Sequence, residues 1–548
     1  MNRDMDALWY KDAVFYELYV RAFSDSNDDG KGDFAGLIDK LDYLQQLGVD
    51  CIWLLPVYAS PLRDDGYDVA DFYSFHPDYG TVEDFQALLT EAHRRGLRVI
   101  TDLVVNHTSD QHPWFVESRA SKTSSKRDYY VWSETDQKYL DARIIFLDTE
   151  SSNWAYDPIS GEYYWHRFFS HQPDLNFDNP AVQQAMLDVM AYWLDMGIDG
   201  FRADAVPYLY EREGTNCENL PETHAYLKRV RRFMDERYRD GILLGEANQW
   251  PEDVRPYFGA GDEFHMAFHF PVMPRLYMAL QKQDHSPILQ IMKRTPDIPH
   301  TCQWCTFLRN HDELTLEMVT PEEREFMWQA YAPQPEMRLN LGIRRRLAPL
   351  LDNDRRKIEL LNSLLFTLPG SPIIYYGDEI GMGDNIALPD RNGVRTPMQW
   401  LDAPYAGFCS RVVSRTYSPV IDDPIYGYQR VNVEAQLKDS GSLLNFMRRI
   451  IRCRKQHPAL GRGTCEFLEC ANRAVLAHIR RHDGEDIFAS HNLSDAAQRV
   501  TLDVQGFVGA VPVDVLTEKA FAPVSGQRYE LVLGPYQYLW LLLEKRRD

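Results

Sequence analysis

The chain has 548 residues, of which 59 are lysine or arginine and 81 are aspartate or glutamate, so its net charge is −22. Hydrophobic residues make up 44% and charged residues 26%, a globular composition that excludes the disordered and fibrous classes. Such an acidic surface repels phosphate backbones and anionic lipid, so we expect neither nucleic acid nor a membrane surface as a partner.

The sequence carries no recognisable export or membrane signal, so we expect a cytoplasmic protein. The longest apolar stretch, residues 360–376, is interrupted by Asn362, Pro369 and Pro372 and falls short of the roughly 18 residues that a spanning helix needs. Residues 1–12 contain no apolar signal region. Eight cysteines are too few for a disulfide framework in a chain of this length.

Short apolar runs alternate with helical patterns along most of the chain, an order typical of parallel strands joined by crossover helices. In chain order, the predicted strands are residues 14–20, 52–55, 99–104, 200–203, 242–245, 264–268, 306–309 and 373–376. Thr81 with Asp84, and Asn179 before Pro180, are N-terminal caps of two intervening helices. Eight strands separated by helices predict an α/β fold, a (β/α)8 TIM barrel, rather than an open doubly wound sheet.

Two insertions and a C-terminal region depart from this pattern. Residues 107–173 are rich in aromatic residues, Ser and Asp and show no helical period, which predicts an excursion domain grown from the loop after the third strand. A second insertion, at about residues 313–354, follows the seventh strand. Residues 460–548 alternate as strands do and predict an antiparallel β-sandwich. The barrel itself is then expected to comprise residues 1–106 and 174–459.

Charged and polar residues gather where the predicted strands end, which is where barrels of this kind place their reacting groups. They are Asp102, Asn106 and His107 after the third strand, Arg202 and Asp204 at the fourth, Glu246 after the fifth, and His311 and Asp312 after the seventh. Three carboxylates on one face are costly to bury unless they are paired or used. Paired carboxylates in a chain rich in aromatics point to glycosyl chemistry, in which one carboxylate attacks the anomeric carbon and the other exchanges a proton.

The surroundings of these residues indicate their roles. Asp204 suits the nucleophile, because Arg202 two residues earlier would keep it ionised. Glu246, one residue past an apolar strand, suits the general acid/base whose pKa must be raised. Asp312 would bind sugar hydroxyls and favour the distorted ring of the transition state. The two histidines, His107 and His311, would donate hydrogen bonds to hydroxyl groups.

These segments resemble the α-amylase family of glycoside hydrolases over essentially the whole chain. The matching segments are residues 102–107, 172–176, 200–204, 246 and 307–312. The resemblance implies that Asp204 is the nucleophile, Glu246 the general acid/base and Asp312 the transition-state stabiliser. Residues 64–68 and 395–400 resemble the exo-acting α-glucosidase branch, which implies that Asp64 and Arg395 pair to close the −1 subsite, with Tyr67 stacked on the glucose ring.

A finer resemblance concerns residues 211–224, 245–250 and 311–317, which are similar to family members that interconvert maltose and trehalose inside one site. This implies a lid, formed by the insertion at 313–354 and the loop at 208–219, that retains the freed glucose and excludes water. The candidates for holding that glucose or latching the lid are Asn248, Arg143, Tyr208, Glu313 and Glu317.

Two other functions stay open at this stage. An exo-acting α-glucosidase or oligo-1,6-glucosidase would differ only in the lid region, because it would let water attack the glucosyl intermediate. A barrel that has lost catalysis and serves as a binding subunit is disfavoured, because all three carboxylates are present and no apolar anchor is. The sequence leaves open whether the chain forms a homo-oligomer.

Two metal sites are predicted, and no organic cofactor. Asp25, Asn27, Asp29 and Asp33, with the carbonyl of Lys31, are spaced like the first half of an EF-hand loop and would hold calcium or magnesium, although the glutamate at its twelfth position is missing. The alternative for this loop is a turn that caps the following helix. The family resemblance implies a second, calcium site formed by Asn106, Asp174 and carbonyls near Tyr208 and Leu209, with Glu211 as a further candidate. Shells made only of oxygen exclude zinc and copper as the natural ion.

Overall fold

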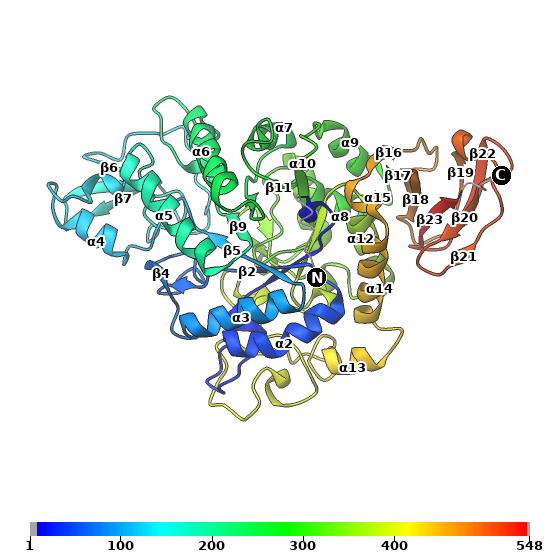
Figure 1. Ribbon diagram of the computed structural model, residues 1–548, viewed down its shortest axis with the longest axis horizontal. Helices are drawn as coiled ribbons and strands as arrows, with labels where there is room; N and C mark the ends of the chain where they lie inside the picture. The colour runs from blue at the N-terminus through cyan, green and yellow to red at the C-terminus, as the bar shows by residue number, and fades with distance from the viewer. Residues whose placement is uncertain (1–7, 545–548) are drawn as a thin grey trace.

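Eight parallel strands close into a barrel at the centre of the computed structural model, which describes residues 8–544 (Figure 1). In chain order they are β1 (Phe15–Leu18), β2 (Cys51–Leu54), β5 (Arg98–Leu103), β9 (Gly200–Ala203), β10 (Ile242–Gly245), β11 (Met266–Phe268), β12 (Gln303–Phe307) and β15 (Ser371–Tyr375). The predicted barrel is therefore confirmed. The strand expected at residues 306–309 begins earlier, because main-chain pairing of Gln303 with Met266, and not apolar character, sets the start of β12.

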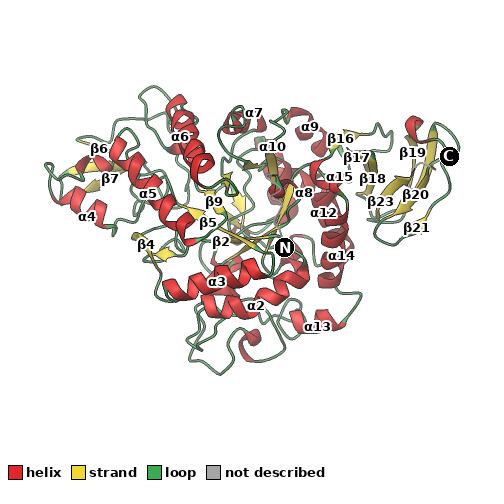
Figure 2. Cartoon of the chain, in the orientation of Figure 1, coloured by secondary structure: helices red, strands yellow, loops and turns green. Residues whose placement is uncertain are grey.

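Helices surround this barrel (Figure 2). The main ones are α2 (Phe34–Leu47), α3 (Val82–Arg94), α5 (Pro180–Met196), α6 (Pro221–Arg237), α8 (Val272–Lys282), α9 (Ser286–Arg294), α12 (Arg355–Thr367) and α14 (Leu443–Gln456). Thr81 and Asp84 form the predicted capping box of α3, and Gly197 ends α5 in the left-handed conformation, with φ 112°. Across residues 8–544, no helix combines the length and the apolar composition that crossing a membrane requires.

The excursion after β5 leaves and rejoins the barrel at one place, where His107 and Asp174 form an isolated antiparallel bridge. It holds a small sheet in the order β6 (Trp132–Ser133), β8 (Glu162–Trp165) and β7 (Trp154–Asp157). The rings of Trp154 and Trp165 lie 5.0 Å apart edge to face in its own small core. This part occupies the left of Figure 1, far from the C-terminal strands.

One helix of the excursion, α4 (Pro113–Ala120), differs from the expectation that this region has no helical period. It starts because His112 caps it and Pro113 occupies its first position. Only Phe115 and Ser118 are buried, so the apolar period of so short a helix is too weak to read from the sequence.

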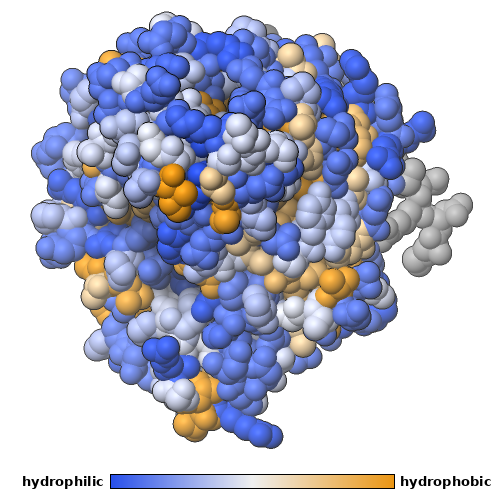
Figure 3. Space-filling view, turned by 90° about the vertical axis from the view of Figure 1, so that its left-hand side faces the viewer, coloured by the Kyte–Doolittle hydropathy of each residue, from blue (hydrophilic) through white to orange (hydrophobic). Residues whose placement is uncertain are grey.

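The face of the molecule on this side is mainly hydrophilic, with hydrophobic side chains in small separate groups (Figure 3).

The C-terminal part contains two antiparallel sheets, so the predicted β-sandwich is confirmed. The larger sheet has the order β16 (Thr464–Phe467), β17 (Val475–His482), β18 (Glu485–Asn492), β23 (Tyr538–Glu544), β20 (Val511–Asp514) and β21 (Lys519–Ala520), and the smaller pairs β19 (Gln498–Asp503) with β22 (Arg528–Leu533). The indole of Trp540 in β23 donates to the hydroxyl of Ser363 in α12 at 2.8 Å, which ties the sandwich to the barrel. The outer ends of the two predicted terminal domains, residues 1–7 and 545–548, lie outside the described residues.

The insertion after β12 returns to the barrel through a bridge between Leu314 and Ile343. It contains α10 (Pro321–Tyr331) and the short pair β13 (Arg338–Leu339) and β14 (Gly342–Ile343). Asn340, in the turn between these two strands, donates to Glu313 at 3.3 Å. The turn therefore lies beside the strand end that carries Asp312 and Glu313.

Candidate active site

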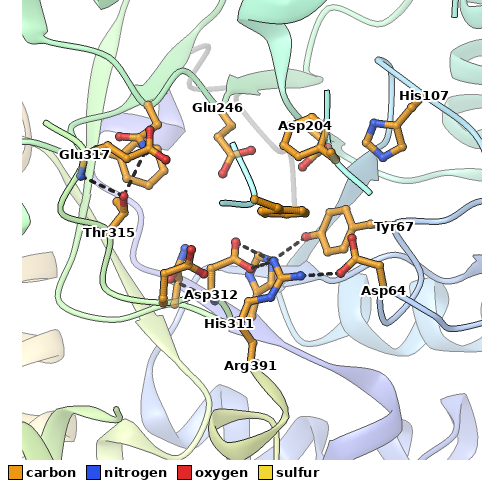
Figure 4. Close-up of a pocket in the computed structure, with 16 residues that line it drawn as sticks. Asp64, Tyr67, His107, Asp204, Glu246, His311, Asp312, Thr315, Glu317 and Arg391 are labelled. Carbon is orange, nitrogen blue, oxygen red and sulfur yellow. Dashed lines mark hydrogen bonds and ion pairs between the residues drawn. The ribbon is translucent and has the colours of Figure 1, made fainter. Parts of the chain in front are cut away.

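A cavity of about 110 Å³ lies at the carboxyl end of the barrel strands (Figure 4). It is lined by Asp64, Tyr67, His107, Phe146, Phe168, Asp204, Glu246, Asn248, Phe270, Asn310, His311, Asp312, Glu313, Thr315, Glu317 and Arg391. Asp204 follows β9, Glu246 follows β10 and Asp312 follows β12, so the three carboxylates come from three strand ends, as expected. Figure 4 shows Asp204 and Glu246 on one side of the cavity and Asp312 on the other.

Arg202 lies beneath two of these carboxylates and is itself 1% exposed. Its Nη1 donates to Asp204 Oδ1 at 2.7 Å and also to Asp102, and its Nη2 is 2.6 Å from Glu246 Oε1. A planar guanidinium with several donors fixes the carboxylates at defined angles. One buried cation thus holds Asp204 and Glu246 in place while it offsets their charge.

The environments of these acids separate their pKa values. Burial raises the pKa of Asp204 to about 6, with Arg202 opposing the shift. Burial raises the pKa of Glu246 to about 8, again opposed by Arg202 and reinforced by the charge of Asp204. Burial also works against ionisation of Asp312, but His311, Arg391 and Arg395 hold its pKa below the ordinary value. Near pH 7, Asp204 and Asp312 are therefore ionised and Glu246 carries a proton.

The expected effect of Arg202 on Asp204 is opposed by burial. We expected the guanidinium to keep Asp204 ionised, and it does favour the ionised form, but the pKa of Asp204 still lies above its ordinary value. The reason is that removal of the carboxylate from water, together with the nearby charges of Asp102 and Asp312, outweighs the attraction of Arg202. Arg202 limits the shift and does not reverse it.

His311 is held from below by a residue that sequence reasoning missed. Its Nδ1 lies 2.5 Å from Oε1 of Glu17, and that oxygen also accepts the main-chain N–H of His311 at 3.2 Å. On the other side of the ring, Nε2 lies 2.9 Å from the hydroxyl of Tyr67 and 3.2 Å from Oδ2 of Asp312. Burial raises the pKa of Glu17. A protonated Glu17 would donate its O–H to Nδ1, and the neutral ring would then carry its own N–H at Nε2, facing Tyr67 and Asp312.

The predicted pairing of Asp64 with Arg395 is wrong. Asp64 pairs with Arg391, whose Nη2 donates to Asp64 Oδ1 at 2.7 Å and whose Nη1 donates to Asp312 Oδ1 at 2.8 Å. Arg395 donates to Asp65 at 2.6 Å and to Asp312 at 3.0 Å. Asp65, whose backbone is left-handed with φ 47°, is therefore the carboxylate that pairs with Arg395 in place of Asp64. Arg391 therefore lines the cavity and Arg395 lies behind it.

Four of the five predicted lid residues lie together beside the cavity, which two of them, Asn248 and Glu317, line. Arg143 of the excursion contacts Glu317 at 2.7 Å and donates to the hydroxyl of Tyr208 at 3.1 Å, while Asn248 donates to Glu317 at 3.1 Å. These contacts connect the excursion with the segments after β9, β10 and β12. Glu313 also lines the cavity but bonds to Asn340 instead of joining this group.

Five further lining residues were missed besides Arg391. They are Phe146, Phe168, Phe270, Asn310 and Thr315. Asn310 lies inside the recognised segment 307–312, so its position was available as a signal. The two excursion phenylalanines had only the aromatic richness of residues 107–173 as a signal, because no strand end marks them. His107 lines the cavity as predicted, and its buried Nε2 has no partner among residues 8–544.

The second predicted metal site contains oxygen atoms that lack partners. Asn106 Oδ1, Asp174 Oδ2 and Glu211 Oε1 are buried, and each is without a hydrogen-bond partner within residues 8–544. Burial raises the pKa of Asp174 to about 8 and raises that of Glu211 as well, and the two carboxylates repel each other. Orphaned hard oxygen ligands fit a calcium ion, which would satisfy them and remove this repulsion.

The loop at residues 25–33 behaves differently. Asp25 accepts the amides of Asn27, Asp28 and Gly30, and Asp33 accepts those of Ser26 and Gly36. Asp33 thereby caps α2, which is the alternative that the sequence left open. Because these buried oxygens are satisfied, they give no sign of a missing ion, and calcium or magnesium at this loop stays a prediction. Among residues 8–544, no three His, Cys, Asp or Glu side chains cluster in a way that could hold a metal.

A closed parallel barrel with carboxylic acids of separated pKa at its strand ends is typical of enzymes that act on glycosidic bonds. The chain belongs to the alpha-amylase family: the model of the alpha amylase catalytic domain matches residues 17–331 and 343–463. The model of the maltogenic amylase C-terminal domain matches residues 465–540. The family resemblance seen in the sequence is thus confirmed.

Within this family, the chain is similar to proteins named trehalose synthase. It is 58% identical to the trehalose synthase of Pimelobacter sp. strain R48 over 98% of this chain and 96% of that one. It is also 58% identical to the trehalose synthase/amylase of Mycobacterium tuberculosis H37Rv, over 98% of this chain and 91% of the relative. Among solved structures, the trehalulose synthase of Pseudomonas mesoacidophila MX-45 superposes with a TM-score of 0.78 at 28% identity, covering 98% and 99% of the two chains.

Proposed function

We propose that the chain interconverts maltose and trehalose inside one closed site by a retaining double displacement. The observation that carries the proposal is the convergence of Asp204, Glu246 and Asp312 on one small cavity, with pKa values that suit a nucleophile, an acid and a stabilising carboxylate. The full-length similarity to proteins named trehalose synthase supports the choice of substrates.

In the first step, Asp204 attacks the anomeric carbon of the non-reducing glucose of maltose. The bond to the glycosidic oxygen breaks, and Glu246 gives its proton to that oxygen, so a glucosyl ester on Asp204 and free glucose result. In the second step, the anomeric hydroxyl of the retained glucose attacks the anomeric carbon of the glucosyl group that is bound to Asp204. Glu246 takes the proton of that hydroxyl, the ester bond breaks, and trehalose leaves Asp204 ionised again.

The remaining residues of the cavity would hold the reacting ring. Asp64 and Asp312, fixed by Arg391, present acceptors to sugar hydroxyls, and the ionised Asp312 stabilises positive charge on the ring carbon in the transition state. His107, whose Nε2 has no partner within the described residues, is placed to donate to a hydroxyl. Burial lowers the pKa of His107 to about 3, so it would do so as a neutral ring.

Isomerisation requires that water be kept from the glucosyl ester while the freed glucose turns over. The contacts of Arg143 with Glu317 and Tyr208 tie the excursion across the cavity mouth. The freed glucose would leave the site only after these contacts open. Occasional opening would admit water to the glucosyl ester, so we expect minor hydrolysis.

The first experiment follows the products of maltose by proton NMR. Trehalose as the main early product, with little free glucose, supports the proposal. Free glucose alone, at two equivalents per maltose, would overturn it in favour of an α-glucosidase. The covalent step is tested with the Glu246→Gln variant and α-glucosyl fluoride, whose leaving group needs no acid. Mass spectrometry should find the ester on Asp204, and Glu246→Gln/Asp204→Asn should form none.

The lid is tested with Glu317→Ala, which removes the partner of both Arg143 and Asn248. The ratio of glucose to trehalose should rise several-fold, because water gains access to the ester. Glu325→Ala is a matched control, since Glu325 is exposed on α10 and accepts only from Gln329 among residues 8–544. An unchanged product ratio in Glu317→Ala would remove Glu317 from the lid.

Calcium is proposed at Asn106, Asp174 and Glu211, where it would join the start and the end of the excursion to the barrel. Its contribution would be structural, as a charge that compensates two buried carboxylates. The purified protein should contain about one tightly held calcium per chain at this site. Chelation should lower the melting temperature, and Asp174→Asn should lose both the metal and the sensitivity to the chelator.

A further inference from the structure

A cleft larger than the catalytic cavity lies at the opposite, amino end of the barrel. It encloses about 600 Å³, against about 110 Å³ for the catalytic cavity. Its walls come from the amino end of β12, from Pro369 in the loop before β15, from α9 and the loop that follows it, and from β16 and β17 of the C-terminal sandwich. We call it the amino-end cleft. None of its lining residues belongs to the site described above.

The charge of the amino-end cleft is opposite to that of the chain. Among residues 8–544, its lining includes the cations Lys11, Lys293, Arg462 and Arg480 but only one carboxylate, Asp297, in a chain of net charge −22. Arg462 pairs with Asp12 at 2.6 Å. Within residues 8–544, neither of the two lysines nor Arg480 has an ion pair. A concave surface of one sign concentrates counter-ions of the other.

Arg480 contributes a buried charge that the described part of the chain does not neutralise. Its side chain is almost fully buried and donates to the carbonyls of Thr367 at 2.8 Å, Gly463 at 3.0 Å and Thr464 at 3.3 Å. Burial lowers its pKa, which records the cost of keeping this cation out of water. Carbonyl dipoles satisfy some of its donors, but no carboxylate among residues 8–544 offsets the charge.

A second guanidinium strengthens the field. Arg454 of α14 is also buried and donates to the carbonyls of Phe366 at 2.6 Å and Gly370 at 2.7 Å. Burial and the repulsion of Arg480 lower the pKa of Arg454 to about 9. Two close buried cations without an ion pair in the described chain would be relieved by an anion in the cleft beside them.

The rest of the lining is apolar and partly aromatic. It includes Leu289, Met292, Ile298, Trp304 and Phe467. Inorganic ions gain nothing from such walls, whereas a ring can pack against them or stack on an aromatic face. A neutral disaccharide could accept hydrogen bonds from these cations but would leave their charge uncompensated. The lining therefore favours a ligand that combines an anionic group with a ring.

We propose that the amino-end cleft binds a small organic phosphate with a sugar or similar ring. The phosphate would lie against Lys11, Lys293 and Arg480, and the ring would pack against Phe467 and the apolar wall. Phosphate suits this lining because its oxygens accept several charge-assisted hydrogen bonds at once. The proposal is independent of the reaction at the carboxyl end.

The test is isothermal titration of the full chain with glucose 6-phosphate while the catalytic cavity is saturated with trehalose. We expect one site per chain. Inorganic phosphate should bind at least about tenfold more weakly, and glucose should give no binding under the same conditions. Equal affinity for inorganic phosphate would overturn the assignment of the ring. Absence of saturable binding at millimolar concentrations, or displacement by trehalose, would overturn the proposal as a whole.

Two variants locate the site. Lys11→Gln/Lys293→Gln should weaken glucose 6-phosphate binding about tenfold or more, because two charges are removed. Lys438→Gln is the matched control, since Lys438 lies on α13 (Val433–Lys438) and pairs only with Glu434 among the described residues. Phe467→Ala should weaken glucose 6-phosphate but leave inorganic phosphate unchanged. Unaltered binding in the double lysine variant, with its circular dichroism spectrum retained, would overturn the placement.

Discussion

At the carboxyl end of the barrel the buried guanidinium groups of the site contact carboxylates, whereas Arg454 and Arg480 at the amino end contact main-chain carbonyl groups. Arg202 contacts Asp102, Asp204 and Glu246, and Arg391 joins Asp64 to Asp312. Arg480 has three carbonyl acceptors and, within residues 8–544, no ion pair.

The difference shows two ways in which one barrel uses buried charge. Where each cation is paired, the groups are fixed in position and their pKa values are set before a substrate arrives. Where cations are left unpaired, the same desolvation cost persists until a ligand brings the missing charge. Variants at the two ends should therefore affect different measurements, catalysis at one and ligand binding at the other.

Replacing Glu246 by glutamine should have the largest effect, lowering kcat for maltose by about 10²- to 10⁴-fold because the proton donor is lost. In the parent chain, kcat/KM should rise as Asp204 loses its proton near pH 6 and fall as Glu246 loses its own near pH 8. The falling limb should vanish in Glu246→Gln, which has no such proton to lose. A falling limb that persists would assign that pKa to another group.

Arg391→Gln should lower kcat/KM by about 10²-fold, because it removes the cation shared by Asp64 and Asp312 and leaves Asp64 without an ion pair within residues 8–544. It should also shift the pH dependence of kcat/KM. Burial raises the pKa of Asp64 to about 7 and Arg391 opposes this rise, so the pKa of Asp64 should be higher in the variant. Arg345→Gln is the control, because Arg345 pairs with the buried Asp384 at 3.0 Å outside the cavity. Equal losses in both variants would mean that Arg391 acts through stability alone.

Glu17→Ala should lower kcat by about 10- to 100-fold, because His311 loses the group that fixes its ring beside Asp312. Glu17→Gln should recover most of this loss, since the raised pKa of Glu17 favours its protonated form, and an amide can likewise donate to Nδ1. Steady-state kinetics of the two variants decide the matter. If kcat falls as far in Glu17→Gln as in Glu17→Ala, Glu17 acts as an ionised carboxylate.

The smallest effect on catalysis is expected at the amino end. Lys11→Gln/Lys293→Gln should keep kcat and KM for maltose within about twofold of the parent chain, because neither lysine lines the catalytic cavity. Kinetics in buffer free of phosphate measure this. A loss as large as that of Arg391→Gln would show that the two ends are coupled and would end the contrast between them.

The barrel and the three acids could be predicted because their signals are local. Each strand is a short apolar run. Asp204 and Glu246 directly follow such runs and Asp312 lies a few residues after one, so the fold alone brings them to one face. The capping box of α3 is local in the same way, since Thr81 and Asp84 lie three residues apart. The helix α4 was missed because two buried positions are too few to show a period.

Pairs of residues that lie far apart in the sequence could not be predicted in this way. Asp64 and Arg391 are 327 positions apart, and nothing local in the sequence shows that Asp64 pairs with Arg391 while Asp65 pairs with Arg395. Glu17 and His311 are separated by 294 positions, so the sequence shows Glu17 only as a charged residue inside a strand. The sequence by itself determined which chemical groups stand at the strand ends. The tertiary structure alone decided their partners, their burial and hence their pKa values, because these depend on groups that folding brings together from distant parts of the chain.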